Sequence, residues 1–237
     1  MFDLINANTV SKRMKELNRF IDFWYGPHKR SYGSSDLEPC LPTVLTAFYK
    51  RNAFRPPVNQ KIASFDFFYQ GGGSHHLLAP TDLGLRSKER VKFFQEYQGD
   101  FEGFTLKNAD DPEVWLEGYV SYCGFYSQNE KRIVKLASTL SFFIVTHVVM
   151  TSLFELDNSR FHSGTSVRSP NALYYEFHEA RADSRLIWDA YIDQEPHCPY
   201  YVGRVYLFRD TILVFDSPSG LTFGSNDDHH ANLFKSG

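Results

Sequence analysis

The sequence predicts an α+β fold in which a mostly antiparallel sheet packs against N-terminal and central helices. Apolar residues recur at helical spacing near the N-terminus, alternate with period two from about residue 63 to 120, and form a nearly continuous apolar stretch over 133–153. Helices therefore flank a run of strands instead of alternating with them one by one. A chain of 237 residues is within reach of one enlarged domain, so we expect a single domain over 1–237.

Two amphipathic helices are predicted before the strands. The first ends near Gly26-Pro27, and its apolar positions are Val10, Met14, Leu17, Phe20, Ile21 and Trp24. The second has Pro42 in its first turn and stops before Pro56-Pro57; its stripe is Leu41, Val44, Leu45, Phe48 and Tyr49.

The central region predicts several strands. Residues 63–69 alternate until a triple glycine, and 91–97 should pair across Gly99-Asp100 with 101–106. A third strand, 114–120, follows the Asp110-Asp111-Pro112 turn. Residues 133–153 are apolar around most of a helical circumference, which predicts a buried helix, although their β-branched content leaves a strand open.

The C-terminal part predicts a β-hairpin and a short helix. A polar loop or crossover over 157–170 precedes the strands 200–208 and 211–215, which a turn at Arg209-Asp210 connects. A further strand, 221–223, follows, and Ser225 is placed to cap the final helix.

Composition excludes several classes of function. The net charge of −3 and the scattered basic residues argue against a nucleic-acid partner. Cys40, Cys123 and Cys198 are too widely spaced for a disulfide framework or a thiolate zinc site. Polar residues interrupt 133–154, so no membrane span is expected, and the N-terminus lacks the pattern of a secretory signal. We expect a cytoplasmic protein.

Three passages resemble the SUKH superfamily: 41–49 with its Leu-Pro start, 94–99 followed by Asp111-Pro112-Glu113-Val114-Trp115, and 138–153 with Ser141-Phe142-Phe143. Tyr97 stands where the family pattern has Asn. The likeness covers 41–153, and the C-terminal elements over 171–237 agree only in type. Bacterial members are largely immunity proteins against secreted toxins, and yeast relatives regulate cell-wall synthesis. The resemblance implies a sheet packed on helices, no catalytic residues, no cofactor and function through a protein interface.

The segment 95–117 is the candidate partner-binding region. It carries seven acids against one base, Lys107, and such clustered charge would steer a basic toxin domain toward the protein. The alternative is that these are solvated charges of turns and strand edges. Interleaved aromatic residues are typical interface anchors, although core burial is about equally common for each. The candidate partner-binding residues are Glu96, Tyr97, Asp100, Glu102, Asp111, Glu113, Trp115 and Glu117.

The leading hypothesis is an immunity protein that neutralises a cognate toxin by direct binding. An intracellular regulatory scaffold of the same fold is the rival. A third hypothesis is a metal-dependent hydrolase built from His75, His76, Asp227 and His229. Adjacent histidines chelate poorly, because neighbouring side chains on a strand point to opposite faces. The triple glycine lacks the Lys-Ser/Thr of a phosphate loop, and no nucleophile elbow occurs.

Overall fold

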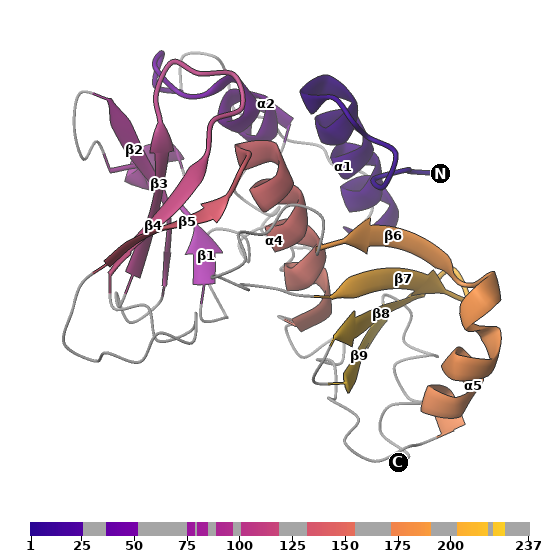
Figure 1. Ribbon diagram of the computed structural model, residues 1–237. Helices are drawn as coiled ribbons and strands as arrows, with labels where there is room; N and C mark the ends of the chain where they lie inside the picture. Colours follow the sequence, from indigo (N-terminus) through magenta and orange to yellow (C-terminus); the bar gives the residue numbers. More distant parts are fainter. Residues whose placement is uncertain are drawn as a thin grey trace, which may run out of the picture.

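The protein has an α+β architecture with two antiparallel sheets (Figure 1). The structure is a computed structural model, and it describes residues 1–25, 37–51, 75–78, 80–84, 89–96, 101–118, 132–154, 172–190, 203–217 and 220–225. The predicted fold class is confirmed. The predicted strand 63–69, the loop 157–170 and the helix after Ser225 lie outside the described residues.

Both predicted N-terminal helices are present. Helix α1 (Val10–Tyr25) begins after Thr9, whose Oγ1 accepts a hydrogen bond from Lys12 N at 3.3 Å. Helix α2 (Thr43–Arg51) begins one residue after Pro42, whose carbonyl accepts from Thr46 N at 3.0 Å. Pro42 thus stands immediately before the assigned start of the helix, and its carbonyl closes the first helical turn. Each helix buries most of the apolar stripe that its sequence predicts: Val10 is only partly buried, and Leu41 is buried but lies before α2.

The five-stranded sheet is a meander in chain order. Its strands are β1 (His75–Leu77), β2 (Arg90–Glu96), β3 (Phe101–Leu106), β4 (Val114–Gly118) and β5 (Arg132–Ala137). The predicted hairpin of 91–97 with 101–106 is confirmed as β2–β3. The third predicted strand is β4, described as far as Gly118. A short 3₁₀ turn, Pro80–Asp82, lies between β1 and β2.

The prediction of one helix over 133–153 was wrong in its first part. Residues Arg132–Ala137 form β5, and helix α4 (Leu140–Phe154) follows. The switch occurs at Thr139, whose Oγ1 accepts from Phe142 N at 3.3 Å and so begins the helix. Ile133 is 54% exposed whereas Leu136 is buried, which is a strand's pattern. The continuous apolar appearance therefore combined a half-buried strand with a fully buried helix.

The four-stranded sheet has the order β6 (Arg185–Asp189), β7 (Arg204–Phe208), β8 (Ile212–Ser217) and β9 (Gly220–Ser225). The predicted hairpin is its β7–β8 pair, and Arg209 and Asp210 take the positive φ angles of a tight turn. Helix α5 (Ala172–Ala180) and the 3₁₀ turn Arg181–Asp183 precede β6. Neither α5 nor β6 was expected from the sequence.

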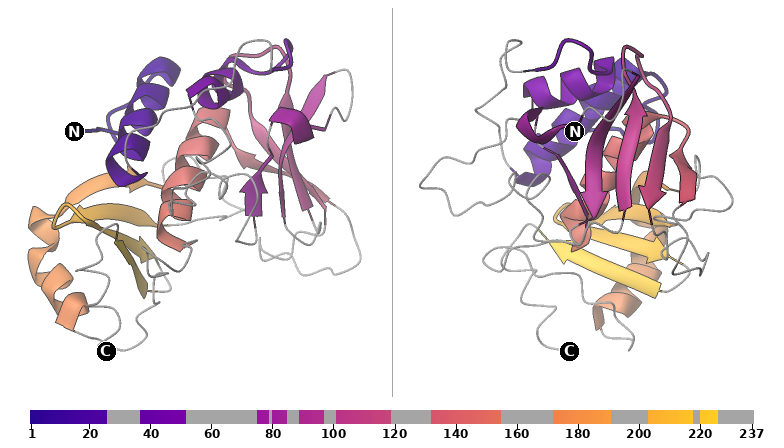
Figure 2. Two further views of the ribbon diagram at one scale, coloured as in Figure 1. Left: turned by 180° about the vertical axis from the view of Figure 1, so that it is seen from behind. Right: turned by 90° about the vertical axis from the view of Figure 1, so that its left-hand side faces the viewer.

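Helix α4 lies between the two sheets, as Figures 1 and 2 show. Toward the five-stranded sheet, the Phe143 ring meets Phe94 edge-on at 5.0 Å between centroids. Toward the four-stranded sheet, Trp188 Nε1 donates to Thr146 Oγ1 at 2.9 Å. One hydrophobic core includes buried residues of both sheets and of α1, α2 and α4. A helix that is apolar all round is thus explained by burial on every side.

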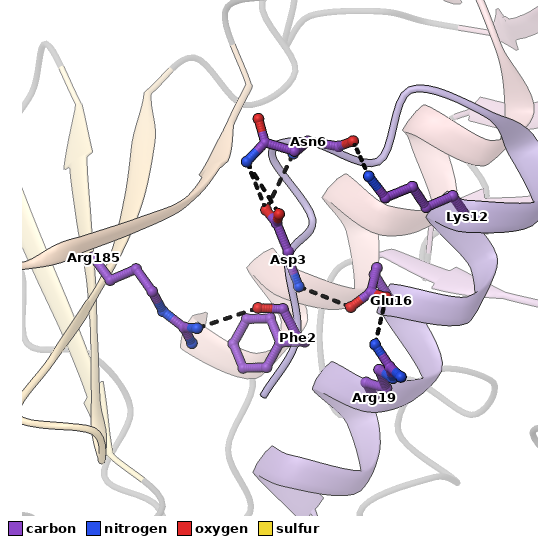
Figure 3. Close-up of polar contacts among 7 residues, drawn as sticks. All are labelled: Phe2, Asp3, Asn6, Lys12, Glu16, Arg19 and Arg185. Carbon is purple, nitrogen blue, oxygen red and sulfur yellow. Dashed lines mark hydrogen bonds and ion pairs between the residues drawn. The ribbon is translucent and has the colours of Figure 1, made fainter.

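The N-terminal residues connect α1 to the four-stranded sheet (Figure 3). Phe2 is buried, its carbonyl accepts from Arg185 Nη1 at 3.2 Å, and the Arg185 guanidinium lies 4.5 Å from its ring centroid. Asp3 N donates to Glu16 Oε2 at 2.8 Å. Hydrogen bonds from Asn6 hold the pKa of Asp3 below its ordinary value. Residues 2–6 therefore connect α1 to strand β6 of the four-stranded sheet, and we call them the N-terminal strap.

Candidate protein-binding face

The face of the five-stranded sheet that points away from α4 collects several of the predicted partner-binding residues. We call it the outer sheet face. It comprises Glu113, just before β4, and these residues on β2 to β5: Arg90, Lys92, Gln95, Glu102, Phe104, Leu106, Trp115, Glu117, Ile133 and Lys135. Neighbours in sequence such as Val114 and Leu116 are in the core. Figure 2 shows this face with no described helix across it.

The strand register aligns these residues in rows. One row runs from Lys92 through Phe104 and Trp115 to Lys135. A second row contains Glu102, Glu117 and Ile133. Because opposite residues of antiparallel strands have Cβ atoms about 5 Å apart, each row is a continuous strip of side chains.

Aromatic and apolar groups occupy the middle and edges of the outer sheet face. Phe104 is buried on this face although it lies outside the main core, and Arg90 covers it with its guanidinium 4.8 Å from the ring centroid. Trp115, beside Phe104 in the register, is half-buried. Leu106 is 45% exposed and Ile133 54% exposed. Trp115 thus lies beside a buried aromatic ring, and the more exposed side chains Leu106 and Ile133 lie on the same face.

Charges on the outer sheet face are balanced rather than acidic. Lys92 Nζ lies 2.7 Å from Glu102 Oε1, and Lys135 Nζ lies 2.7 Å from Glu113 Oε1. With Arg90 and Glu117, the face carries three bases and three acids. The segment 95–117 carries an excess of acidic residues, but the outer sheet face is not uniformly acidic. Strands β2 and β5 supply basic residues from outside that segment. Glu102 and Glu117 are directly opposite, and Lys92 offsets their repulsion.

Asp111 serves the fold instead of the surface. Its Oδ1 accepts from Ser141 N at 2.7 Å and its Oδ2 from Ser141 Oγ at 2.6 Å, at the start of α4. Arg13 Nη1 also donates to Ser141 Oγ at 2.7 Å. Its neighbour Asp110 accepts from Thr43 Oγ1 at 2.8 Å, and its carbonyl accepts from Val44 N at the start of α2. The two aspartates thus cap two different helices with favourably placed negative charge.

The remaining predicted residues fall partly outside the described chain. Tyr97 and Asp100 lie outside it, as do Asp227 and His229 of the metal hypothesis. Glu96 is paired with His75 at the β1–β2 edge, where the structure describes only its backbone. Among the described residues, no three His, Cys, Asp or Glu side chains gather closely enough to hold a metal ion. Every helix in the described part of the chain is too short or too polar to cross a bilayer.

A second polar cluster lies on the four-stranded sheet. Arg204 Nε donates to Asp189 Oδ2 at 2.9 Å, and Arg181 donates to Asp216 and to the Tyr206 hydroxyl. The hydrogen bond to Tyr206 raises the pKa of Arg181, and the hydrogen bond to Asp189 raises the pKa of Arg204. Each carboxylate thus faces a guanidinium, an arrangement that ties β6, β7, β8 and the 3₁₀ turn before β6 together.

The bases and Phe104 of the outer sheet face were not among the predicted site residues. Period-two alternation places Arg90 and Lys92 on one face of β2, so half of the signal was present in the sequence. The other half is the register, which sets Lys92 beside Glu102 and Lys135 beside Trp115.

Comparisons of the chain with protein-family models, curated proteins and solved structures found no match.

Proposed function

We propose that the chain is a non-catalytic protein-binding domain that acts in the cytoplasm as an immunity protein against a cognate toxin. The observation that carries this proposal is the outer sheet face, which brings Glu102, Glu113, Trp115 and Glu117 together on one side of the sheet. The motif resemblance to the SUKH superfamily over 41–153 supports the same function. Binding would neutralise the toxin by covering its active or substrate-binding surface.

The composition of the outer sheet face suits recognition of a structured partner. Protein interfaces are anchored by a few aromatic and arginine residues, surrounded by polar groups that exclude water. Here Trp115 is the anchor, while Leu106 and Ile133 supply accessible apolar area. Balanced charges fix orientation and discriminate among partners more than they accelerate the encounter. We therefore expect specificity from the pattern of Glu and Lys residues rather than from a net acidic field.

The central test is Trp115→Ala in binding to a cognate toxin domain, to be sought in the reading frame beside the gene. We expect a loss of about 2 kcal/mol or more, roughly thirtyfold in Kd by isothermal titration calorimetry, because the anchor is removed. Tyr175→Ala is the matched control, since Tyr175 is an exposed aromatic residue, 56% accessible, on α5. Full affinity of the Trp115 variant together with a weakened Tyr175 variant would move the interface to the other sheet.

A second test reverses charge on the outer sheet face. The double variant Glu113→Lys with Glu117→Lys should fold and bind a cognate toxin more weakly, with a loss that shrinks as salt rises. Asp111 is excluded from this variant because it caps α4. Affinity that is unchanged at low and high salt would show that these carboxylates do not face the partner.

The regulatory-scaffold hypothesis remains the alternative, because the same face would serve either role. Co-expression separates the two. Rescue of cells from a toxin domain encoded nearby, lost with Trp115→Ala, supports immunity. Absence of rescue and of complex formation with any toxin domain encoded nearby would contradict immunity and leave the scaffold function.

A further inference from the structure

Arg13 of α1 reaches the β3–β4 turn through a chain of hydrogen bonds. Its Nη1 donates to Ser141 Oγ at 2.7 Å and to Thr139 Oγ1 at 3.3 Å. The Ser141 hydroxyl in turn donates to Asp111 Oδ2 at 2.6 Å, and Ser141 is fully buried. A single hydroxyl group therefore separates a guanidinium of the first helix from a carboxylate of the turn. We call Arg13, Ser141 and Asp111 the Arg13 relay.

The chemistry of the three groups fixes the direction of the relay. A guanidinium only donates and a carboxylate only accepts, so the hydroxyl between them accepts from Arg13 and donates to Asp111. Both hydrogen bonds involve a charged group, and such bonds are stronger than neutral ones. Hydrogen bonds in a chain also polarise one another. Loss of Arg13 would therefore weaken the bond between Ser141 and Asp111 as well as its own.

A stiff link joins Asp111 to the outer sheet face. The next residue, Pro112, is buried and has a fixed φ, and a residue before proline is restricted to extended conformations. Glu113 follows, one residue before the first ladder pair of β4 with β3 at Val114. Its carbonyl accepts from Thr105 Oγ1 at 2.7 Å. The direction of Glu113 therefore depends on the turn as well as on the sheet.

Glu113 is the point at which the relay meets the proposed interface. Its Oε1 lies 2.7 Å from Lys135 Nζ, and the Glu113 side chain is 46% exposed. Lys135 is directly opposite Trp115 in the register of β4 with β5. A change in the direction of Glu113 therefore alters the charges beside the tryptophan that a partner would contact.

We propose that Arg13 is a positioning residue for the outer sheet face. Through the relay it sets the direction in which Glu113 and its ion pair with Lys135 face a partner. This inference rests on the proposed binding function of that face. Arg13 is half-buried on α1, whereas the face is built from β2 to β5 and Glu113, so Arg13 acts only through the residues between them.

The first test needs no partner. In amide NMR spectra of the whole protein, Arg13→Met should shift the signals of Glu113 and Lys135. Lys15→Met is the matched control, because Lys15 is an exposed residue of the same helix, and it should leave both signals in place. Arg13→Lys keeps a positively charged donor and should shift the same signals less, which provides a readout even if the methionine variant does not fold. Unchanged Glu113 and Lys135 signals in the Arg13 variants would overturn the proposal.

The second test measures affinity for a cognate toxin domain at a temperature where each variant is folded. Arg13→Met should weaken binding about three- to fivefold, a size typical of residues that act without touching the ligand. In the Glu113→Gln background the same change should have almost no further effect, because the relay acts through that carboxylate. Arg13→Lys should retain more of the affinity. A residue that only stabilises the fold would not give a loss that depends on Glu113.

Equal losses from Arg13→Met in both backgrounds would overturn the proposal, because Arg13 would then act by another route. Failure of the relay and failure of the binding face are distinguishable. Unchanged amide signals together with weakened binding by Trp115→Ala would reject the relay alone. Full affinity of Trp115→Ala would reject the binding face, and this inference with it, whatever the amide signals show.

Discussion

The two sheets of this protein differ in how many of their faces are buried. In the five-stranded sheet, β4 alternates between buried residues such as Val114 and Leu116 and partly exposed ones such as Trp115. In the four-stranded sheet, consecutive residues of β7 from Val205 to Phe208 are all buried. Val205 and Leu207 face the main core, whereas Tyr206 and Phe208 join the cluster under α5. Both faces of that sheet are thus buried, whereas the outer sheet face of the five-stranded sheet keeps partly exposed side chains such as Trp115.

The largest expected effect of breaking this difference is on α5. Phe177 is fully buried and meets Tyr206, Phe208 and Phe223 with ring centroids 5.6, 5.7 and 6.3 Å away. Phe177→Ala should lower the free energy of unfolding by about 3–5 kcal/mol and expose amides of the four-stranded sheet to hydrogen exchange. Urea denaturation measures the first effect. Tyr175→Ala, on the exposed side of the same helix, should change stability by less than about 0.5 kcal/mol.

Next in size is a change at the inner side of the five-stranded sheet. A Cβ at Gly103 would lie 2.9 Å from Phe94 Cβ, so Gly103→Ala should cost about 1–3 kcal/mol through overpacking. At Gly84 the nearest atom to an added Cβ is 3.3 Å away on the Lys92 side chain. Gly84→Ala should therefore cost less in the same denaturation experiment. Equal losses in the two variants would show that Phe94 can move aside.

A smaller loss is expected where the β3–β4 turn meets α4. Asp111→Ala removes both bonds to Ser141, a fully buried residue, and should cost about 1–2 kcal/mol in thermal or urea unfolding. Glu113→Gln removes only the partly exposed ion pair with Lys135, so less than about 1 kcal/mol is expected. An Asp111 variant as stable as Glu113→Gln would contradict its capping role.

The smallest effect concerns the N-terminal strap. Because folding lowers the pKa of Asp3, its contribution is complete above the ordinary value of about 3.8 and is lost as the pH falls through the folded value. Asp3 is largely exposed, so the effect should be slight. The urea midpoint should drop somewhat less between pH 5.5 and pH 2.5 in Asp3→Asn than in the unchanged protein. Identical curves would show that the Asn6 contacts add nothing to stability.

Much of the fold was predictable because local patterns and tertiary packing agree. A pattern within a few residues predicts each of three features: the apolar stripe of α1, the hairpin of β2 with β3, and the turn at Arg209-Asp210. The boundary between β5 and α4 was not predictable in this way, because apolar residues continue through it and only Ser138-Thr139 marks the change. Strand β6 is five residues long and has partly buried Arg185 and Leu186 at its start, so periodicity alone is weak there.

The candidate site was predictable in its acids and Trp115 but not in its charge. Lys92 and Lys135 come from strands before and after the acidic segment, and only the sheet register places them against Glu102 and Glu113. Asp111 illustrates the same limit. A count along the chain cannot show that one carboxylate of a cluster turns inward to a helix that begins about thirty residues later.

The double cap at Asp110-Asp111 also bears on the order of folding. Helices α2 and α4 begin nearly a hundred residues apart, yet groups at the start of both donate hydrogen bonds to this one dipeptide. The β3–β4 hairpin closes over few residues and can form early, whereas docking of either helix must wait for a long loop to close. We therefore expect the hairpin to act as the template on which two distant parts of the chain are assembled.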